Sequence, residues 1–325
     1  MKVSVIIPVY RVEKFIEKCA ASLFSQTLDD VEFIFVDDAS PDNSMAVLEK
    51  CIQQYPQRKA QIRMLTHKEN KGLPAARNTG LAAASGEYVF HCDSDDFVEP
   101  DMLETLYDEA KRKDADIVWC DWYLSFEHNE RYMKQPDYAT PMEALKAMLA
   151  GLMKFNVWNK LVRRRLYADN QIAFPAGYAM GEDMTMMLLF AVAGRVAYVP
   201  QAFYHYVKLN TEAYSQNFSL NHLESVKHNI RTVELFLHSR LGNALDLEIA
   251  CMKLEAKFPF LMSNRKEMYR LWERTYPEAN IYILQNYYIS KRRRWVQWCA
   301  AKQLWLLVRL HGWIVGKLIY GIIYR

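Results

Sequence analysis

The feature that most constrains the fold is the regular alternation of short β-branched runs with helical patterns near the start of the chain. Each run is brief and apolar, and a stretch with apolar residues at helical spacing follows it. Strands that alternate with helices form parallel sheets, because each helix returns the chain to the start of the next strand. We therefore predict an α/β fold with strands at 3–7, 33–36, 62–65 and 88–91, and helices from residue 15 to 24, at 43–55 and at 73–84.

The pattern beyond residue 100 is more mixed. We predict helices at 100–112, 142–152, 158–166 and from Gly181 to about residue 194, strands at 117–119 and 195–199, and a polar surface loop at 127–140. Residues 220–286 have a helical pattern throughout. A chain of 325 residues exceeds the usual length of one domain, so we expect a core domain followed by a helical accessory region.

Charge and cysteine content exclude several classes of protein. A net charge of +3 is too small for a protein that follows nucleic-acid phosphates, so we expect no nucleic-acid partner. The six cysteines contain no C-x-x-C pair, which favours a reducing cytosol. The first ten residues are too short for a secretory signal, and Lys302, Arg309 and Lys317 interrupt the most apolar segment. We expect a cytoplasmic protein without a spanning helix.

Acidic residues follow the strand at 88–91. Asp93 and Asp95 are two apart, so an extended backbone directs both carboxylates to the same side. Mg²⁺ and Mn²⁺ prefer a few protein oxygens together with phosphate oxygens and water, so this pair could hold such an ion against a diphosphate. The alternative is a polar loop that caps the next helix. Because ligands of parallel sheets bind beyond the carboxyl ends of the strands, we favour the metal.

Two other strand ends carry polar groups. Asp37 and Asp38 could accept hydrogen bonds from a nucleobase or ribose, or could form an Asx turn before the next helix. The segment 70–78 leads into a helix of small residues, which would let the backbone approach a ligand. Arg77 and Asn78 in this segment could equally be ordinary residues on the helix surface.

A third acidic group opens the helix that starts near Gly181. Glu182 and Asp183 could simply satisfy the unpaired amides of the first helical turn. Transfer of a group to an alcohol, however, requires a base near the acceptor oxygen, and a carboxylate in a cleft suits that task. Both readings stay open on the local sequence.

Taken in order, these motifs resemble the family 2 glycosyltransferases of GT-A fold. The motifs are Ile6-Ile7-Pro8-Val9-Tyr10, Phe35-Val36-Asp37-Asp38-Ala39-Ser40, Asn70-Lys71-Gly72-Leu73, Ala76-Arg77-Asn78, Asp93-Ser94-Asp95-Asp96 and Gly181-Glu182-Asp183. The resemblance covers residues 1–210 and implies a Rossmann-like, mostly parallel sheet flanked by helices. It also implies an inverting hexosyltransferase that uses a nucleotide-diphosphate sugar, usually linked to UDP, with Mn²⁺ or Mg²⁺.

Residue roles follow from the resemblance by position. It assigns nucleotide-sugar binding to Pro8, Val9, Tyr10, Asp38, Asn70, Lys71, Gly72, Arg77, Asp93 and Ser94. The first three would line the base site, Asp38 would bond the uracil and Asp93 would approach the ribose. Asp95 would ligate the metal, and Asp183 would be the catalytic base with Glu182 beside it.

Some positions depart from the family pattern or extend it. Arg11 stands where the family commonly has Asn, and Ala39 stands where Gly is usual. The segment Trp158-Asn159-Lys160-Leu161 resembles one found in bacterial members that build polysaccharides. His205 could lie near the diphosphate, but a histidine packed between its tyrosine neighbours is favoured.

The last segment lies outside the resemblance. Residues 291–294 are four consecutive cations, and tryptophans and aliphatics follow, with Lys302, Arg309 and Lys317 near one stripe if the segment is a single helix. This composition indicates a basic amphipathic tail at an anionic membrane surface, and the alternative is a helix packed on the protein or on a dimer partner. We therefore divide the chain into 1–210, 211–290 and 291–325.

The predicted reaction is transfer of a sugar from a UDP-sugar to a hydroxyl of a glycan or lipid-linked acceptor. One alternative is a sugar-phosphate nucleotidyltransferase, which would need a Gly-rich loop after the first strand, where this chain has Pro-Val-Tyr-Arg. Another is an inactive nucleotide-sugar-binding protein at the membrane, which the intact acidic motifs disfavour. A dinucleotide dehydrogenase lacks its G-x-G-x-x-G motif here. The sugar, the acceptor and the oligomeric state are left open.

Overall fold

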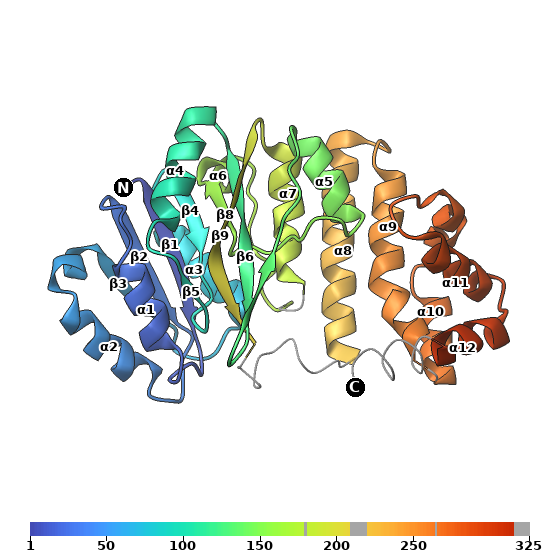
Figure 1. Cartoon of the computed structure of the whole chain (residues 1–325), viewed down its shortest axis with the longest axis horizontal. Helices are drawn as coiled ribbons and strands as arrows, with labels where there is room; N and C mark the ends of the chain where they lie inside the picture. Colours follow the sequence, from blue (N-terminus) through green and yellow to red (C-terminus); the bar gives the residue numbers. More distant parts are fainter. Residues whose placement is uncertain (179–180, 209–219, 264, 315–325) are drawn as a thin grey trace. The chain divides into compact units, whose positions relative to one another are not determined.

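The fold begins with a parallel sheet, seen in blue and cyan in Figure 1. The computed structural model describes residues 1–178, 181–208, 220–263 and 265–314. Its first four strands are β1 (Val3–Val9), β2 (Val31–Asp37), β3 (Ile62–Thr66) and β4 (Tyr88–His91), and their pairings with one another are parallel. Helices α1 (Ile16–Phe24), α2 (Ser44–Gln54) and α3 (Leu73–Ala83) connect them. The predicted alternation of strand and helix is confirmed.

The second half of the sheet is mostly antiparallel. It contains β5 (Phe97–Val98), β6 (Ile117–Ser125), β7 (Glu130–Met133), β8 (Lys160–Arg163) and β9 (Val196–Val207). The strand order is β3-β2-β1-β4-β8-β6-β9-β5, and β7 pairs with β6 off this path. Helix α4 (Met102–Lys113) packs on β6 and β9, while α5 (Pro141–Leu149), α6 (Arg165–Asp169) and α7 (Thr185–Val192) complete this part. The sheet of the described chain is therefore mixed.

Three sequence predictions are wrong in this half. Residues 158–166, predicted as a helix, contain strand β8, which lies between β4 and β6 and pairs antiparallel with both. The predicted loop at 127–140 contains β7, and β5 was not predicted at all. Strand β8 has only four residues, so its type is decided by hydrogen bonds to its two neighbours rather than by its own apolar pattern.

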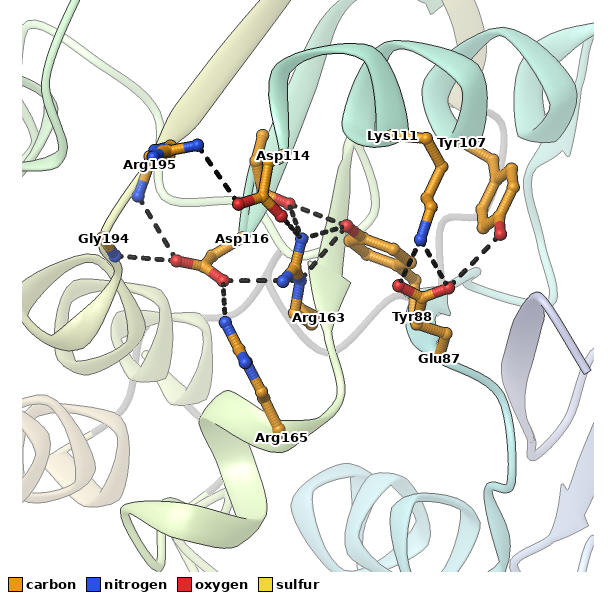
Figure 2. Close-up of polar contacts among 11 residues, drawn as sticks. Glu87, Tyr88, Tyr107, Lys111, Asp114, Asp116, Arg163, Arg165, Gly194 and Arg195 are labelled. Carbon is orange, nitrogen blue, oxygen red and sulfur yellow. Dashed lines mark hydrogen bonds and ion pairs between the residues drawn. The ribbon is translucent and has the colours of Figure 1, made fainter.

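The arginine run that begins at the last residue of β8 joins neighbouring strands at one end of the sheet. Figure 2 shows Arg163 between Asp114 and Asp116, at 2.8 Å and 3.4 Å, and Arg165 also reaches Asp116 at 3.2 Å. Arg195, just before β9, pairs with Asp114 at 3.1 Å. These ion pairs join the starts of β6 and β9 to the end of β8, so the run serves the architecture.

The described chain forms two compact units. The first comprises residues 1–145 and 154–233, and the second comprises residues 146–153 with the chain from residue 234 onward. Helix α8 (Leu220–Leu241) contributes to both, and the predicted boundary near residue 210 lies outside the described residues. The predicted division into three parts stays a prediction.

The second unit is helical, as predicted. Besides the end of α8 it contains α9 (Asp246–Lys257), η4 (Phe258–Met262), α10 (Lys266–Arg274), η5 (Pro277–Gln285), α11 (Lys291–Ala301) and α12 (Trp305–Ile314). Its core includes Trp272, which is fully buried, and the ammonium of Lys257 lies 4.1 Å from the centre of that ring. The same ammonium donates to the carbonyl oxygens of Thr275 and Tyr276 and to Asn280 Oδ1, so its burial is compensated.

The predicted single helix of the tail is interrupted. Helix α11 ends at Ala301, and Gln303 has a positive φ of 57°, which ends the helix before α12 begins. Lys302 and Arg309 therefore do not lie on one helix, and Lys317 is outside the described residues. No helix in the described part of the chain has the length and apolar character needed to cross a membrane.

Candidate functional site

The end of β2 organises the loop that leads into α3. Asp38 Oδ1 accepts from the backbone amide of Lys71 and Oδ2 from that of Gly72, both at 2.8 Å. Asp38 Oδ1 also lies 2.6 Å from His67 Nδ1, while Asp37 Oδ1 accepts from the amide of Ser40 at 2.8 Å. Asp37 therefore accepts from the amide three residues on, within the turn after β2, whereas the next helix has Asn43 as its N-cap; Asp38 fixes the predicted loop 70–72 beside the sheet.

The residues predicted to line the base site lie next to this turn. Pro8 and Val9 are buried at the end of β1, and the carbonyl of Val9 accepts from the amide of Asp38 at 3.0 Å. Tyr10 is exposed. The two residues that depart from the family pattern both have left-handed backbones, with φ of 55° at Arg11 and 54° at Ala39. Asn and Gly tolerate this conformation better than Arg and Ala, which gives the family preference a physical reason.

Arg77, on α3, gathers three carboxylates. Its side chain is 1% exposed, and Nη1 donates to Asp183 Oδ1 at 2.6 Å and to Glu182 Oε1 at 3.3 Å. Nη2 donates to Asp93 Oδ1 at 2.9 Å. The alternative of an ordinary surface residue is therefore wrong for Arg77. The predicted carboxylates from separate parts of the chain meet around one guanidinium at the end of β4.

Burial dominates the electrostatics of this cluster. It raises the pKa of Glu182 to about 8, with a further rise from Asp183 that Arg77 partly offsets. The pKa of Asp183 is also raised, first by burial and then by Asp93, again against the effect of Arg77. Burial alone would lower the pKa of Arg77, but Asp183, Asp93 and Glu182 raise it. The pKa values of Glu182 and Asp183 are thus raised above those of exposed carboxylates, which suits acid–base work.

The neighbouring residue of α3 holds the segment that precedes Glu182 and Asp183. Asn78 Nδ2 donates to the carbonyl oxygen of Phe174, and Asn78 Oδ1 accepts from the amide of the same residue, both at 2.8 Å. The ring of Phe174 lies 5.5 Å from the Arg77 guanidinium carbon. One turn of α3 therefore positions both sides of the acidic cluster.

The Asp93–Asp96 loop is fastened to β9. Tyr204 Oη donates to Asp96 Oδ2 at 2.7 Å and accepts from the amide of Asp93 at 3.1 Å. Asp96 Oδ1 accepts from the amide of Val207 at 2.7 Å, and burial raises the pKa of Asp96 well above its usual range. Ser94 is buried, whereas Asp93 and Asp95 are partly exposed. The two outer carboxylates of the loop are thus held without being covered.

This donor set fits a divalent cation that takes most of its ligands from elsewhere. No group of three or more His, Cys, Asp or Glu side chains with metal-binding geometry occurs among the described residues. Mg²⁺ and Mn²⁺ at phosphate sites need only one or two protein carboxylates, and diphosphate oxygens and water complete the shell. The partly exposed Asp93 and Asp95 meet that requirement.

A comparison with known families decides the relationship. The model described as "Glycosyl transferase family 2" matches residues 4–180, which is more than half of the chain. The chain belongs to glycosyltransferase family 2. The predicted family is confirmed, and with it the glycosyltransferase class of enzyme.

Several bacterial glycosyltransferases resemble the chain. It is 36% identical over 212 residues to the uncharacterized glycosyltransferase EpsJ of Bacillus subtilis, covering 63% of this chain and 60% of that protein. It is 31% identical to the glycosyltransferase GlyG of Streptococcus pneumoniae, over 67% of this chain and 75% of GlyG. It is 33% identical to the cholesterol galactosyltransferase of Borreliella burgdorferi, over 73% of this chain and 67% of that enzyme.

The fold resembles that of TarS from S. aureus. The structure of TarS residues 1–349 in complex with UDP-GlcNAc has a TM-score of 0.71 and 20% sequence identity, and the match covers 95% of this chain and 90% of that one. At this identity the likeness shows the fold alone. It confirms the predicted GT-A fold class for this chain, whose mixed sheet is flanked by helices and followed by a C-terminal helical region.

Sequence reasoning missed three residues that support this family 2 site. His67 joins Asp38 to Thr79, which lies 2.8 Å from its Nε2; its place just after β3 was an available signal. Tyr204 was not singled out. Lys160 is fully buried, and its ammonium donates to the carbonyls of Lys154 and Asn156 and to Asn159 Oδ1. Burial lowers the pKa of Lys160 to about 7, and Asp183 opposes this shift. The segment Trp158-Asn159-Lys160-Leu161 was singled out for its resemblance to bacterial members, but the sequence did not indicate that Lys160 is buried.

His205 is a packed residue, as favoured. Its ring stacks between those of Phe97 and Tyr123, with centroid distances of 4.1 Å and 4.8 Å. Its two ring nitrogens lie 2.9 Å from Glu99 Oε1 and 2.7 Å from Glu130 Oε1. Both nitrogens therefore have partners within the protein.

Proposed function

We propose that this protein transfers a sugar from a UDP-sugar to a hydroxyl acceptor with inversion at the anomeric carbon. The single observation that carries the proposal is the meeting of Asp93, Glu182 and Asp183 around buried Arg77, in a chain of glycosyltransferase family 2. Such a cluster places a base close to the loop that would hold a diphosphate. Membership of this family also favours transfer over the nucleotidyltransferase alternative.

In the proposed reaction Asp183 is the general base. Its carboxylate takes the proton of the acceptor hydroxyl while the acceptor oxygen forms a bond to the anomeric carbon. The bond from that carbon to the diphosphate oxygen breaks, and the electron pair leaves with UDP. Arg77 holds Asp183 in place at 2.6 Å, and Glu182, with its pKa raised by burial to about 8, stays protonated beside it at neutral pH. A protonated Glu182 leaves two charged carboxylates, Asp183 and the partly exposed Asp93, next to the Arg77 guanidinium, which lowers the cost of burying the cluster.

The nucleotide would bind at the ends of β1 and β2. We propose that Pro8, Val9 and Tyr10 line the uracil and that Asp38 contacts it. Asp38 would at the same time order the loop 70–72, because its carboxylate accepts hydrogen bonds from the amides of Lys71 and Gly72. Asn70, Lys71 and Gly72 would face the nucleotide, and Asp93 and Ser94 the ribose. Support for a UDP-linked donor comes from TarS, a protein of the same fold whose structure contains UDP-GlcNAc.

The cofactor of the proposed reaction is Mn²⁺ or Mg²⁺. Asp95 would hold it together with the diphosphate, and Asp93 lies in the same loop. When bound, such an ion neutralises the charge that develops on the leaving diphosphate. A mannosyltransferase from Pyrobaculum calidifontis has been solved with GDP-Man and Mn²⁺.

The acceptor belongs to the proposal as a class, a hydroxyl of a glycan or of a lipid-linked molecule. One relative is named for transfer to cholesterol, and acceptors therefore differ within this group. A lipid-linked acceptor would lie at the inner face of the cell membrane, where residues 291–325 would meet an anionic surface. The competing reading is a protein that binds nucleotide sugars without turnover.

Release of UDP from a panel of UDP-sugars, with and without Mn²⁺, tests the proposal. We expect release to require an acceptor and the metal, and to fall at least about a hundredfold in Asp183→Asn, because the general base contributes that much or more. Asp95→Asn should lose the response to Mn²⁺. The exposed Asp169, on α6, supplies the matched control Asp169→Asn, which should keep full activity. Calorimetric binding of UDP-sugars without release for any acceptor would favour the competing reading.

A further inference from the structure

One part of the second unit carries many exposed apolar side chains. Half of the large hydrophobic side chains that are exposed in the described part of the chain lie between Ile281 and Ile314. We call this the η5–α12 surface, and its main members are Ile281, Leu284, Tyr287, Leu306, Leu310 and Trp313. Leu306 is 80% exposed and Ile281 is 72% exposed. Such a concentration on a single part of a chain marks an interaction site.

The exposed side chains are held on packed elements. Val308, on the opposite side of α12 from Leu306, is fully buried, and Trp305 stacks on Tyr269 with 5.0 Å between ring centroids. On α12 the residues 306, 310, 313 and 314 recur at the spacing of one helical face. The helix therefore has a buried face, which contains Val308, and a face on which Leu306 and Leu310 are exposed.

Helix α11 fixes the other end of this surface. Val296 and Cys299 are buried, and the guanidinium of Arg293 pairs with both oxygens of Glu255 at 2.9 Å and 2.8 Å. Arg294 Nη1 donates to the carbonyl oxygen of Leu284 at 3.4 Å, which joins α11 to η5. Helix α11 therefore lies against η5, and it also packs against α12.

After Glu278, the charged side chains of the segment that forms this surface are all positive. From Ala279 to Arg325 the sequence contains no Asp or Glu. Lys291, Arg292, Lys302 and Arg309 are all exposed. A second copy of the same face would bring these cations together, whereas anionic lipid headgroups would neutralise them. Lysine, arginine and tryptophan beside exposed leucines form the composition of helices that lie in a membrane interface.

We propose that the η5–α12 surface rests on an anionic lipid bilayer. Leu306, Leu310 and Trp313 enter the boundary between headgroups and acyl chains, about 5–10 Å deep. Lys302 and Arg309 stay at the level of the headgroup phosphates, where their stems can lie along apolar surface. This attachment extends the basic tail to η5 and does not depend on the transfer reaction.

Co-sedimentation of the full chain with vesicles tests the proposal. We expect binding to phosphatidylcholine vesicles that contain phosphatidylglycerol, weak binding to phosphatidylcholine alone, and loss of binding as salt rises. The variant Leu306→Gln/Leu310→Gln should bind at least about tenfold more weakly, because it removes the two leucines that would be buried. The matched control Leu152→Gln/Leu235→Gln changes two exposed leucines of the same unit and should bind normally.

A charge variant tests the second half of the proposal. Arg292→Gln/Lys302→Gln/Arg309→Gln should reduce binding to anionic vesicles about fivefold per residue, or roughly a hundredfold in total. Its control is Lys50→Gln/Lys59→Gln/Lys113→Gln, three exposed lysines of the first unit. Equal loss in variants and controls would overturn the proposal.

Two further results would also count against a lipid surface. One is vesicle binding that ignores lipid charge and salt. The other is a dimer in light scattering that dissociates in Leu306→Gln/Leu310→Gln while no variant binds vesicles, which would make the surface a subunit interface. UDP release with a water-soluble acceptor should be unchanged in both surface variants, so failure of the membrane proposal and failure of the proposed function are distinguishable.

Discussion

Arg77 carries more of the site than any other single side chain. A buried guanidinium is costly unless it is paired, and three carboxylates surround this one. The carboxylates come from two separate places in the sequence, so Arg77 also determines how Asp93 and the pair Glu182 and Asp183 face each other. Stability and the geometry of the proposed catalytic site therefore depend on the same residue.

Replacing Arg77 should damage both properties. We expect Arg77→Met to lower the free energy of unfolding by about 3–5 kcal/mol, because it leaves buried carboxylates without their partner. UDP release should fall more than a hundredfold, since Asp183 loses its orientation. Chemical denaturation and a UDP-release assay measure the two effects. Arg112→Met, at an exposed pair with Glu109, should change neither by much.

Glu182 should give the protein a pH-dependent stability of unusual sign. Its pKa is raised from the usual 4.5 to about 8, first by burial. The folded state therefore keeps a proton that the unfolded chain releases, and stability falls as pH rises between these values, by up to about 1.4 kcal/mol per pH unit. Glu182→Gln should flatten this dependence in urea unfolding measured at several pH values. An identical slope in the variant would show that Glu182 is ionised throughout.

Ala39 should be strained, because its φ is 54°. A left-handed backbone costs a residue with a Cβ about 1–2 kcal/mol, and glycine avoids that cost at some loss of chain entropy. We expect Ala39→Gly to raise the free energy of unfolding by about 1 kcal/mol. The exposed Ala82, within α3, gives a control of opposite sign, because Ala82→Gly should lower it by about 1 kcal/mol. A loss at both positions would contradict the strain.

Among the elements, those with local signals were predictable. The first four strands and three helices follow from their own apolar periods, and the polar residues at their ends identified Asp38, Asp93 and Asp95. Strand β8 was not predictable, because its four residues become a strand only between β4 and β6. Likewise the burial of Arg77 could not be read from α3, since its partner Asp183 lies 106 residues away.

The hydrogen bonds of Tyr204, which join β9 to the Asp93–Asp96 loop, lead to a prediction at the scale of the elements. Tyr204→Phe removes the hydroxyl that joins Asp96 to the amide of Asp93, and we expect about 1–3 kcal/mol less stability. The Mn²⁺ concentration for half-maximal activity should rise, because the loop that carries Asp95 is released. Tyr88→Phe is the matched control, as its hydroxyl donates to Ala115 and accepts from Arg163 in the edge cluster of Figure 2. That control should lose stability without changing the Mn²⁺ dependence.

At the scale of the whole molecule, the two ends of the strands have different roles. Ion pairs around Asp114 and Asp116 join β6, β8 and β9 at one end, and the acidic cluster around Arg77 lies at the carboxyl end of β4. Ligands of such sheets bind beyond the carboxyl ends of the strands, so the position of the site could be predicted from chain direction alone. The pairing that completes the edge cluster could not, because it depends on β8 being a strand.

Nucleotide binding should therefore stabilise the first unit in particular. A ligand present at a hundred times its dissociation constant contributes about 2.7 kcal/mol to stability. We expect UDP with Mn²⁺ to raise the unfolding temperature of that unit by about 5–10 °C in calorimetry. In Asp95→Asn, UDP should give the same shift with Mn²⁺ as without it. A rise in the parent protein that does not need Mn²⁺ would argue against a metal-bridged diphosphate.

The position of β8 also constrains the order in which the strands can pair during synthesis of the chain. Its residues are made long after those of β4, yet it separates β4 from β6 in the finished sheet. A nascent chain that has emerged only as far as β6 exposes open strand edges, which are sites of wrong pairing. The parallel half of the sheet, β1 to β4, can fold early. The open edges of β4 and β6 stay exposed until β8 and β9 have been synthesised and have paired with them. Slow translation before residue 160 would prolong that exposed interval.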